Sequence, residues 1–331
     1  MATYHKGFKD IKVRLVNSVG NDLAKHVYEF GRLSHDYNEV LPEHYDKTDS
    51  RCVKLIDKII AGTTLPKYAM QGHRLDFEID GISRICLAQI TRDHAIFASG
   101  SGGVYPLTQD FILPLSIYND TDIMDELKFA QKHLEEAYIK ACEKQIPSIE
   151  ARYIGLHCQT ISLTASYLPT DFTRSCYSRT SSNFCDECNY VYRKMYAAVK
   201  VMISQLTDEN SIKLWNWLVN ERNCMNDGIY TRERLYNSDF TTLGEPNDKI
   251  KTIAINDWRK SGWKLELERM YCEEPELLTD KELNLVELWT FGEVTGETLK
   301  TTYSSDNPES LCNAIKKMPY YKEHRNGSKD N

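Results

Sequence analysis

Residues 77–114 read FEIDGISRICLAQITRDHAIFASGSGGVYPLTQDFILP, and the rest of the chain is organised around them. The apolar residues alternate as in a strand up to Asp80 and Gly81, and then recur at helical spacing. This pattern predicts a short strand, a turn at Asp80 and Gly81, and a helix that ends near His94. The helix would present a polar cluster to the loop that follows it. The cluster consists of Gln89, Arg92, Asp93 and His94.

That loop contains three glycines, Gly100, Gly102 and Gly103, together with the hydroxyls of Ser99 and Ser101. Such a composition offers unhindered backbone N–H groups that can surround an anion. The glycines match neither the G-x-x-x-x-G-K-[ST] phosphate motif nor the G-x-G-x-x-G dinucleotide motif. An anion-binding loop and a glycine-rich surface turn both remain open from these residues alone.

Length and charge bound the class of protein. A chain of 331 residues can bury a large core, as one large domain with an extension or as two domains. Its 41 basic and 48 acidic side chains give a net charge of −7. This charge argues against a protein that binds DNA or RNA polymers non-specifically. A local basic pocket for a phosphorylated small molecule is compatible with this charge.

The ten cysteines are scattered singly through apolar segments, which is typical of reduced thiols in an intracellular protein. Cys185 and Cys188 form a C-x-x-C pair, but no second pair accompanies it, so we expect no metal site there. The N-terminus has no apolar signal region, and no run of 18 apolar residues occurs. We therefore expect a soluble, cytoplasmic protein without a membrane partner.

The remaining segments show strand and helix signals in turn. Apolar alternation predicts strands over residues 11–19 and 160–168. Apolar spacing of three and four predicts helices over residues 23–33, 52–60, 122–144, 148–152 and 183–206, with Thr121 as the N-cap of the long third one. Beyond residue 206, five tryptophans between positions 215 and 289 indicate further buried material.

Residues 11–206 resemble the flavin-dependent thymidylate synthases. The opening Val13 to Asp22 segment and the later Gly31 to Ser34 segment are similar to the first strand and helix of that family. Its central motif, F-x-I followed by Q-x-x-R-H-R and later R-Y, is matched in part. The matching positions are Phe77, Ile79, Gln89, Arg92 and Tyr105. The interval from Arg152 to Arg179, with Glu187 after them, also reproduces the spacing of the family's second arginine pair.

This resemblance implies a fold and an assembly. The fold would be mixed α/β, with a thymidylate synthase-like domain over residues 1–206. Residues 207–331 would form a mostly helical C-terminal extension packed on that core, with the last dozen residues flexible. Family members assemble as homotetramers whose active sites draw on several subunits, so we expect a homo-oligomer.

The resemblance also implies a chemistry. The family methylates C5 of dUMP to give dTMP, with carbon from methylenetetrahydrofolate and hydride from FAD that NADPH has reduced. Arg179 would be catalytic by polarising the ring, and Arg152 would hold the nucleotide phosphate. The other implied substrate contacts are Gln89, Ser99, Ser101, Gly102 and Tyr105. The implied cofactor contacts are Arg92, His94, Arg174 and Glu187.

Three departures from the family pattern separate this chain from its relatives. The family's R-H-R is here Arg92-Asp93-His94, and Val104 stands where the family has a phosphate-binding arginine. The N-x-R pair used on the flavin is absent from residues 166–173, and Arg174 is the nearby substitute. Two hypotheses follow. The chain is an enzyme that transfers a methyl or hydroxymethyl group to dUMP or another pyrimidine nucleotide, or it is a non-catalytic nucleotide-binding or assembly subunit.

Ordinary structural roles stand beside these functional ones. Arg152 is also suited to a surface ion pair with Glu150 or Glu143. His94 is suited to capping the C-terminal carbonyls of its helix. Glu187 is suited to a solvated helix start.

Overall fold

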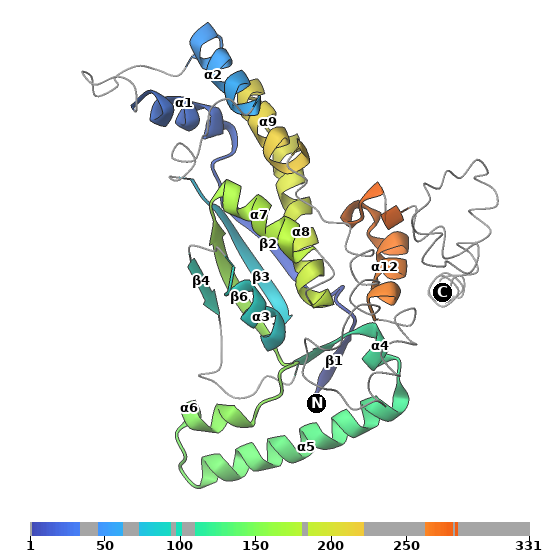
Figure 1. Cartoon of the computed structure of the whole chain (residues 1–331). Helices are drawn as coiled ribbons and strands as arrows, with labels where there is room; N and C mark the ends of the chain where they lie inside the picture. The colour runs from blue at the N-terminus through green and yellow to red at the C-terminus, as the bar shows by residue number, and fades with distance from the viewer. Residues whose placement is uncertain are drawn as a thin grey trace, which may run out of the picture.

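The computed structural model describes residues 2–33, 46–61, 73–93, 97–100, 110–180, 185–221, 262–280 and 282–283. Within these ranges the fold is mixed α/β, as the sequence predicts (Figure 1). A four-stranded antiparallel sheet has the order β2-β3-β6-β4. Its strands are β2 (Lys12–Ser18), β3 (Leu75–Ser83), β6 (Thr160–Tyr167) and β4 (Phe97–Gly100). A second, two-stranded sheet pairs β1 (Thr3–Lys6) with β5 (Asp110–Leu113) in parallel.

The central stretch differs from its predicted form at Gly81. The expected turn there is wrong, because β3 continues through Gly81 to Ser83 with a shift of register against β6. Gly81 has a φ of +81°, a conformation that glycine adopts without steric cost, so the residue makes a bulge in the strand. Helix α3 (Arg84–Ile90) then starts at once, and it ends before the predicted boundary near His94.

The glycine-rich segment begins as a strand and not as a loop. Ser99 and Gly100 belong to β4 and pair with Thr164 and Leu163 of β6. Their backbone is therefore part of the sheet, which corrects the prediction of a loop that starts at Ser99. Residues 101–109 lie outside the described part of the chain.

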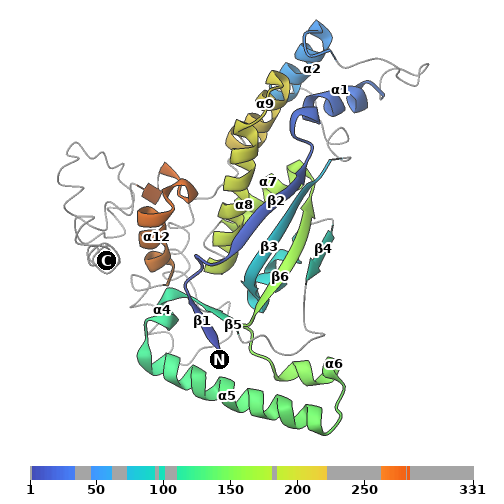
Figure 2. The same cartoon turned by 180° about the vertical axis from the view of Figure 1, so that it is seen from behind.

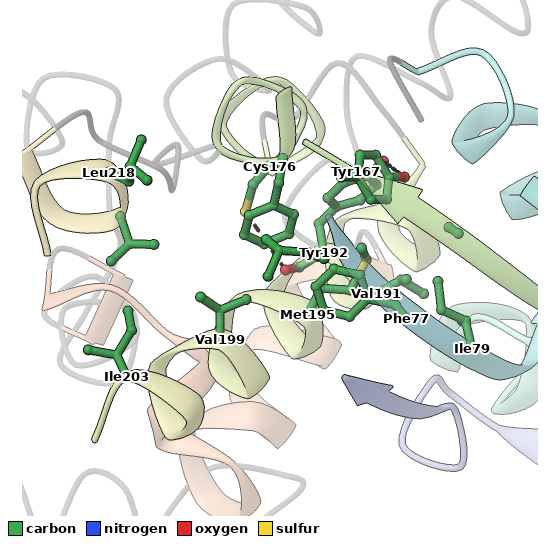
Figure 3. Close-up of a cluster of buried hydrophobic side chains, with 14 of the residues drawn as sticks. Phe77, Ile79, Tyr167, Cys176, Val191, Tyr192, Met195, Val199, Ile203 and Leu218 are labelled. Atoms are coloured by element: carbon green, nitrogen blue, oxygen red, sulfur yellow. Dashed lines mark hydrogen bonds between the residues drawn. The ribbon is translucent and has the colours of Figure 1, made fainter. Parts of the chain in front are cut away.

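Helices α3, α7 (Pro169–Arg179) and α8 (Asp186–Ser204) pack on the four-stranded sheet. Helices α1 (Leu23–Leu33), α2 (Ser50–Ile60) and α9 (Glu209–Asn216) pack against one another beyond one end of the sheet (Figure 1). Helix α8 lies along β2 and β3, and its stripe of Val191, Met195 and Val199 is fully buried. Figure 3 shows the Val191 end of this stripe beside Phe77 of β3, with Val199 farther from that strand. The long amphipathic helix predicted over residues 183–206 is thus confirmed as core, within two or three residues at each end.

Helix α5 (Thr121–Glu143) lies apart from the four-stranded sheet, as both views show (Figure 2). It is preceded by α4 (Leu115–Tyr118) and followed by α6 (Ser148–Ala151) and a 3-10 turn at Arg152–Ile154. Its N-cap is Asp120, whose side chain accepts a hydrogen bond from Ile123 N, so the prediction of Thr121 was one residue late. Met124 and Ala141 are its buried residues, and Phe129 is 63% exposed.

The described part of the C-terminal extension contains α12 (Gly262–Glu273) and a 3-10 turn at Pro275–Leu277. Two buried arginines attach it to its surroundings. Arg193 of α8 binds Glu282 through both terminal nitrogens, at 2.5 Å each. Arg269 binds Glu266, whose other oxygen accepts a hydrogen bond from Phe8 N. These contacts join α12 and its following turn to α8 and to the start of the chain.

Two predictions about the ends of the chain are not tested by this structure. The boundary between residues 206 and 207 stays a prediction, and the last dozen residues lie outside the described ranges. Among the helices that the structure does describe, none is long and apolar enough to cross a membrane.

Candidate functional site

The candidate site is centred on an ion pair between Arg179 and Asp93. Arg179 is the last residue of α7, and Asp93 lies in the turn that follows α3. The Nε of Arg179 lies 2.8 Å from both carboxylate oxygens, and its Nη2 lies 2.6 Å from Oδ1. The two side chains are 9% and 8% exposed. The pair is therefore shielded from water, where charge interactions are stronger than at the surface.

Two tyrosines continue this network into the core. The Tyr192 hydroxyl donates to Oδ2 of Asp93, and it lies 2.8 Å from the Tyr167 hydroxyl. Tyr167 ends β6 and Tyr192 belongs to α8, so the network ties the sheet to two helices (Figure 3). Burial raises the pKa of Tyr192 well above its ordinary value, and the nearby Tyr167 and Asp93 raise it further. The Tyr192 hydroxyl therefore stays protonated and acts as a donor to the carboxylate.

The charge of Arg179 is secured by the same pair. Burial works to lower the pKa of the guanidinium, but the hydrogen bonds and charge of Asp93 outweigh it, so the net pKa is raised. The end of α7 is fixed next to it. Thr180 Oγ1 donates to Cys176 O, and the amide of Asn189 donates to Thr180 O. The position of Arg179 is thus set by the contacts of the next residue, Thr180, and by those of its own side chain.

The polar cluster on α3 has two further members near Asp93. Gln89 lies in the last turn of the helix, and its Oε1 is buried without a hydrogen-bond partner among the described residues. A buried amide oxygen in this state costs free energy, so it is suited to receive a donor from a ligand. Arg92 is exposed, just after the helix end.

Glu187 is buried beneath α3, so its interpretation as a solvated helix start is wrong. Its two oxygens accept hydrogen bonds from Ser83 N and Ser83 Oγ, at 2.5 Å each. Ser83 is in turn the N-cap of α3, because its Oγ accepts from Cys86 N. Burial raises the pKa of Glu187 to about 7, against the opposing effect of the two hydrogen bonds. In this structure Glu187 fixes the start of α3, and its role in holding a cofactor stays a prediction.

The thiols near the site are unsuited to nucleophilic work. Cys86 and Cys188 are fully buried, and burial raises the pKa of Cys86 to about 12. Cys185 is the N-cap of α8, accepting a hydrogen bond from Cys188 N, and its pKa is also raised. No group of three or more potential metal ligands occurs in the described ranges.

The remaining predicted site residues are divided between exposed positions and undescribed ones. Arg174 is exposed on α7, five positions before Arg179 and so on another face of the helix. The backbone of Arg152 lies in the 3-10 turn after α6, and that of Ser99 in β4, but the side chains of both are outside the description. The others outside the described residues are His94, Ser101, Gly102 and Tyr105.

Comparison with known proteins gives matches of fold. No protein-family model matches the sequence, and no curated protein matches it. The UMP/dUMP methylase PolB from Streptomyces cacaoi, bound with 5-Br dUMP, matches at a TM-score of 0.49 and 15% identity, over 65% of this chain and 96% of that one. The flavin-dependent thymidylate synthase ThyX from Helicobacter pylori, complexed with FAD and dUMP, matches at a TM-score of 0.42 and 17% identity. This match covers 56% of this chain and 93% of that one.

The chain thus resembles these enzymes in fold over part of its length, as the motifs predict. At these identities the resemblance concerns the fold alone.

Sequence reasoning missed the partners that hold Arg179. Asp93 stands 86 positions before the arginine, at the place where the family motif has a histidine. The change from a basic to an acidic residue was the available signal, since a carboxylate next to a predicted functional arginine suggests an ion pair. Nothing in the sequence pattern of α8 marks Tyr192, because a buried tyrosine in an apolar stripe reads as core.

Proposed function

We propose that this chain is a one-carbon transferase that acts at C5 of a pyrimidine nucleoside monophosphate. The observation that carries the proposal is the shielded, oriented guanidinium of Arg179, at the position that the motif resemblance assigns to the ring-polarising residue. Methylenetetrahydrofolate would supply the carbon, and the family default is conversion of dUMP to dTMP.

The chemistry requires a fixed cation next to a ring carbonyl. For C5 of a pyrimidine to act as a nucleophile, negative charge has to develop on the carbonyl oxygen, and a guanidinium stabilises that charge best in a shielded site. Arg179 meets both conditions, since its side chain is 9% exposed and held by Asp93. Gln89, with its unsatisfied buried oxygen, would accept a donor from the nucleotide.

FAD, reduced by NADPH, supplies hydride when it is bound. Arg92 and Arg174 are exposed cations on two neighbouring elements, and exposed guanidiniums suit the phosphates of a dinucleotide. His94 would complete this set. Glu187, buried against Ser83, does not join it without a rearrangement of the start of α3.

The change at the phosphate-binding motif favours an altered substrate. Val104 and the glycines before it replace a charged clamp by backbone N–H groups and the hydroxyls of Ser99 and Ser101. We therefore infer a roomier mouth that accepts a pyrimidine nucleotide other than dUMP, or a transfer other than methyl. Arg152 would remain the phosphate contact.

The assembly and compartment follow the family expectation. We infer a homo-oligomer, a tetramer by resemblance, in which large apolar side chains now exposed on and around α5 would be covered. The examples are Phe129 at 63%, Ile139 at 50% and Tyr153 at 87% exposed. Free thiols fit a reducing, cytoplasmic compartment.

The second candidate is a non-catalytic nucleotide-binding or assembly subunit of the same fold. The specific observation in its favour is the loss of the family's flavin-contacting N-x-R pair from residues 166–173. A subunit of this kind would differ from the enzyme in two measurable ways. The purified protein would be colourless, and it would form no product.

The test combines an absorption spectrum with a product assay. The purified protein would be incubated with methylenetetrahydrofolate, reductant, added FAD and each of dUMP, dCMP, UMP and CMP, and the product mass determined. A flavin spectrum and a gain of one methyl or hydroxymethyl group support the enzyme. Formation of dTMP alone would remove the altered-substrate idea. Nucleotide binding without any product would establish the second candidate.

A further inference from the structure

Asp93 is held more firmly than an ordinary surface carboxylate. One side of it receives the Nε and Nη2 of Arg179 in a two-pronged contact. The other side receives the Tyr192 hydroxyl, which is itself paired with the Tyr167 hydroxyl. Its own backbone N–H donates to Ile90 O, which closes the turn after α3. The carboxylate therefore has little freedom to rotate.

A two-pronged contact fixes the plane of a guanidinium, whereas a single contact leaves it free to turn. Because Asp93 is fixed by α8 and β6, the orientation of Arg179 is set by elements other than its own helix. Its plane is thereby defined before any ligand arrives. Such preorganisation is what a charge-stabilising group needs, since reorientation during the reaction costs rate.

The ion pair between Asp93 and Arg179 is expected to add little to the stability of the fold. Burying two charges costs about as much as their attraction returns, and apolar residues of similar size often do as well. The surroundings of the pair are polar on the α3 side, where the buried Oε1 of Gln89 has no described partner. Gln89 stands four residues before Asp93, and a shielded ion pair and an unsatisfied amide oxygen on one short segment suit a polar ligand.

We propose that Asp93 is a positioning residue that sets the plane of the Arg179 guanidinium toward the pyrimidine ring. This inference rests on the proposed function. The carboxylate competes with a neutral ring for the guanidinium, so it weakens binding of the ground state. It keeps the guanidinium aligned for the negative charge that develops later, so it favours the transition state.

The test compares Asp93→Asn, Tyr192→Phe and a matched control, Asp125→Asn, in the full-length chain. Asp125 pairs with Lys128 on the exposed face of α5. Each variant would be measured for dUMP affinity by calorimetry, for turnover of the nucleotide that the unaltered chain converts, and for its melting temperature. Asp93→Asn keeps the shape of the side chain and removes its charge.

The expected result is a split between turnover and affinity. Turnover of Asp93→Asn falls about 10- to 100-fold, the size seen when a supporting residue is removed from a preorganised site. Its dUMP affinity stays within about threefold or becomes tighter, because the competing charge is gone. Tyr192→Phe shows a smaller fall in the same direction, and Asp125→Asn matches the unaltered chain.

Two outcomes would overturn the inference if the chain converts a nucleotide, and two others would overturn it if the chain does not. Unchanged turnover in Asp93→Asn would show that the carboxylate does not position Arg179. A parallel loss of turnover, affinity and melting temperature would show a purely structural ion pair. If the unaltered chain converts no nucleotide, the proposed function fails, and positioning is then tested by dUMP affinity in Asp93→Asn, Arg179→Lys and the double variant. Additive effects there, or no binding at all, would overturn the inference as well.

Discussion

Two shielded arginines in this molecule have opposite surroundings. Arg193 in α8 is fully buried, and its contacts include Asn189, the Leu277 carbonyl and Glu282. Those groups belong to its own helix and to the C-terminal extension, so Arg193 attaches the extension to α8. Arg179 pairs with the carboxylate of Asp93 at the common end of α3 and α7, and its side chain is 9% exposed.

The difference separates arginines that hold a fold from arginines that are available to a ligand. A buried guanidinium surrounded by partners from distant segments stabilises their packing, and losing one partner leaves an uncompensated charge. The Arg179 guanidinium is aligned by Asp93 within a single short stretch of the fold, where α3 and α7 end. The first two of the four predictions below test this division, and the other two test further residues of the site.

The largest effect is a loss of stability expected at the buried ion pair between Arg193 and Glu282. Glu282→Gln should lower the free energy of unfolding by about 3–5 kcal/mol, because Arg193 would remain buried without its counter-charge. Urea denaturation measures this loss. Nucleotide turnover well below the melting temperature should not change. Glu78→Gln is the matched control, since Glu78 pairs with Arg14 at the surface, and it should cost less than about 1 kcal/mol. Equal losses in the two variants would contradict the division.

Arg179→Lys should act on the reaction more than on the fold. Lysine keeps the charge but cannot make the two-pronged contact with Asp93, so we expect turnover to fall about 100- to 1000-fold. Single-turnover kinetics measure this. Arg51→Lys is the control. Arg51 binds Asp49 through the same two nitrogens, Nε and Nη2, at an exposed position. A loss of stability as large as that in Glu282→Gln, with normal turnover, would show that Arg179 stabilises the fold, as Arg193 does.

Arg152→Ala should weaken both nucleotide binding and turnover. If Arg152 holds the phosphate, its removal costs about 2–4 kcal/mol of affinity, since a charge-assisted contact is lost. Calorimetric titration with dUMP measures the change, and the uncharged nucleoside serves as the matched ligand that should be indifferent to it. Unchanged dUMP affinity would remove this residue from the site.

The smallest effect concerns pH and Glu187. Its pKa is raised to about 7 in the folded chain, above its ordinary value of 4.5, so the folded state holds the proton more tightly than the unfolded state. The stability that this contributes is complete below pH 4.5 and is lost as pH rises through 7, by about 3 kcal/mol. Glu187→Gln should flatten this part of the stability curve, measured by denaturation between pH 4.5 and 8. Glu126→Gln, exposed on α5, should leave the curve unchanged, and a persisting slope in Glu187→Gln would refute the assignment.

Local patterns predicted most of the elements but not how they end or bend. The apolar stripe of α8 and the alternation in β2 and β6 were sufficient, because burying one face of a helix or strand requires that spacing. Gly81 was read as a turn, since glycine marks a turn and a bulge alike. Pairing with β6 selected the bulge, and a single sequence does not show which strand will be its neighbour.

The sequence by itself determined the fold class, the buried stripes and the positions of the arginines that carry the motif resemblance. The tertiary structure alone decided which partner each arginine has. It brought Asp93 to Arg179 and Glu282 to Arg193, across 86 and 89 positions of the chain, and it buried Glu187 under Ser83. Charge and spacing along the chain do not encode these choices, because an ion pair depends on a separation of a few ångströms that the packing of sheet and helices sets.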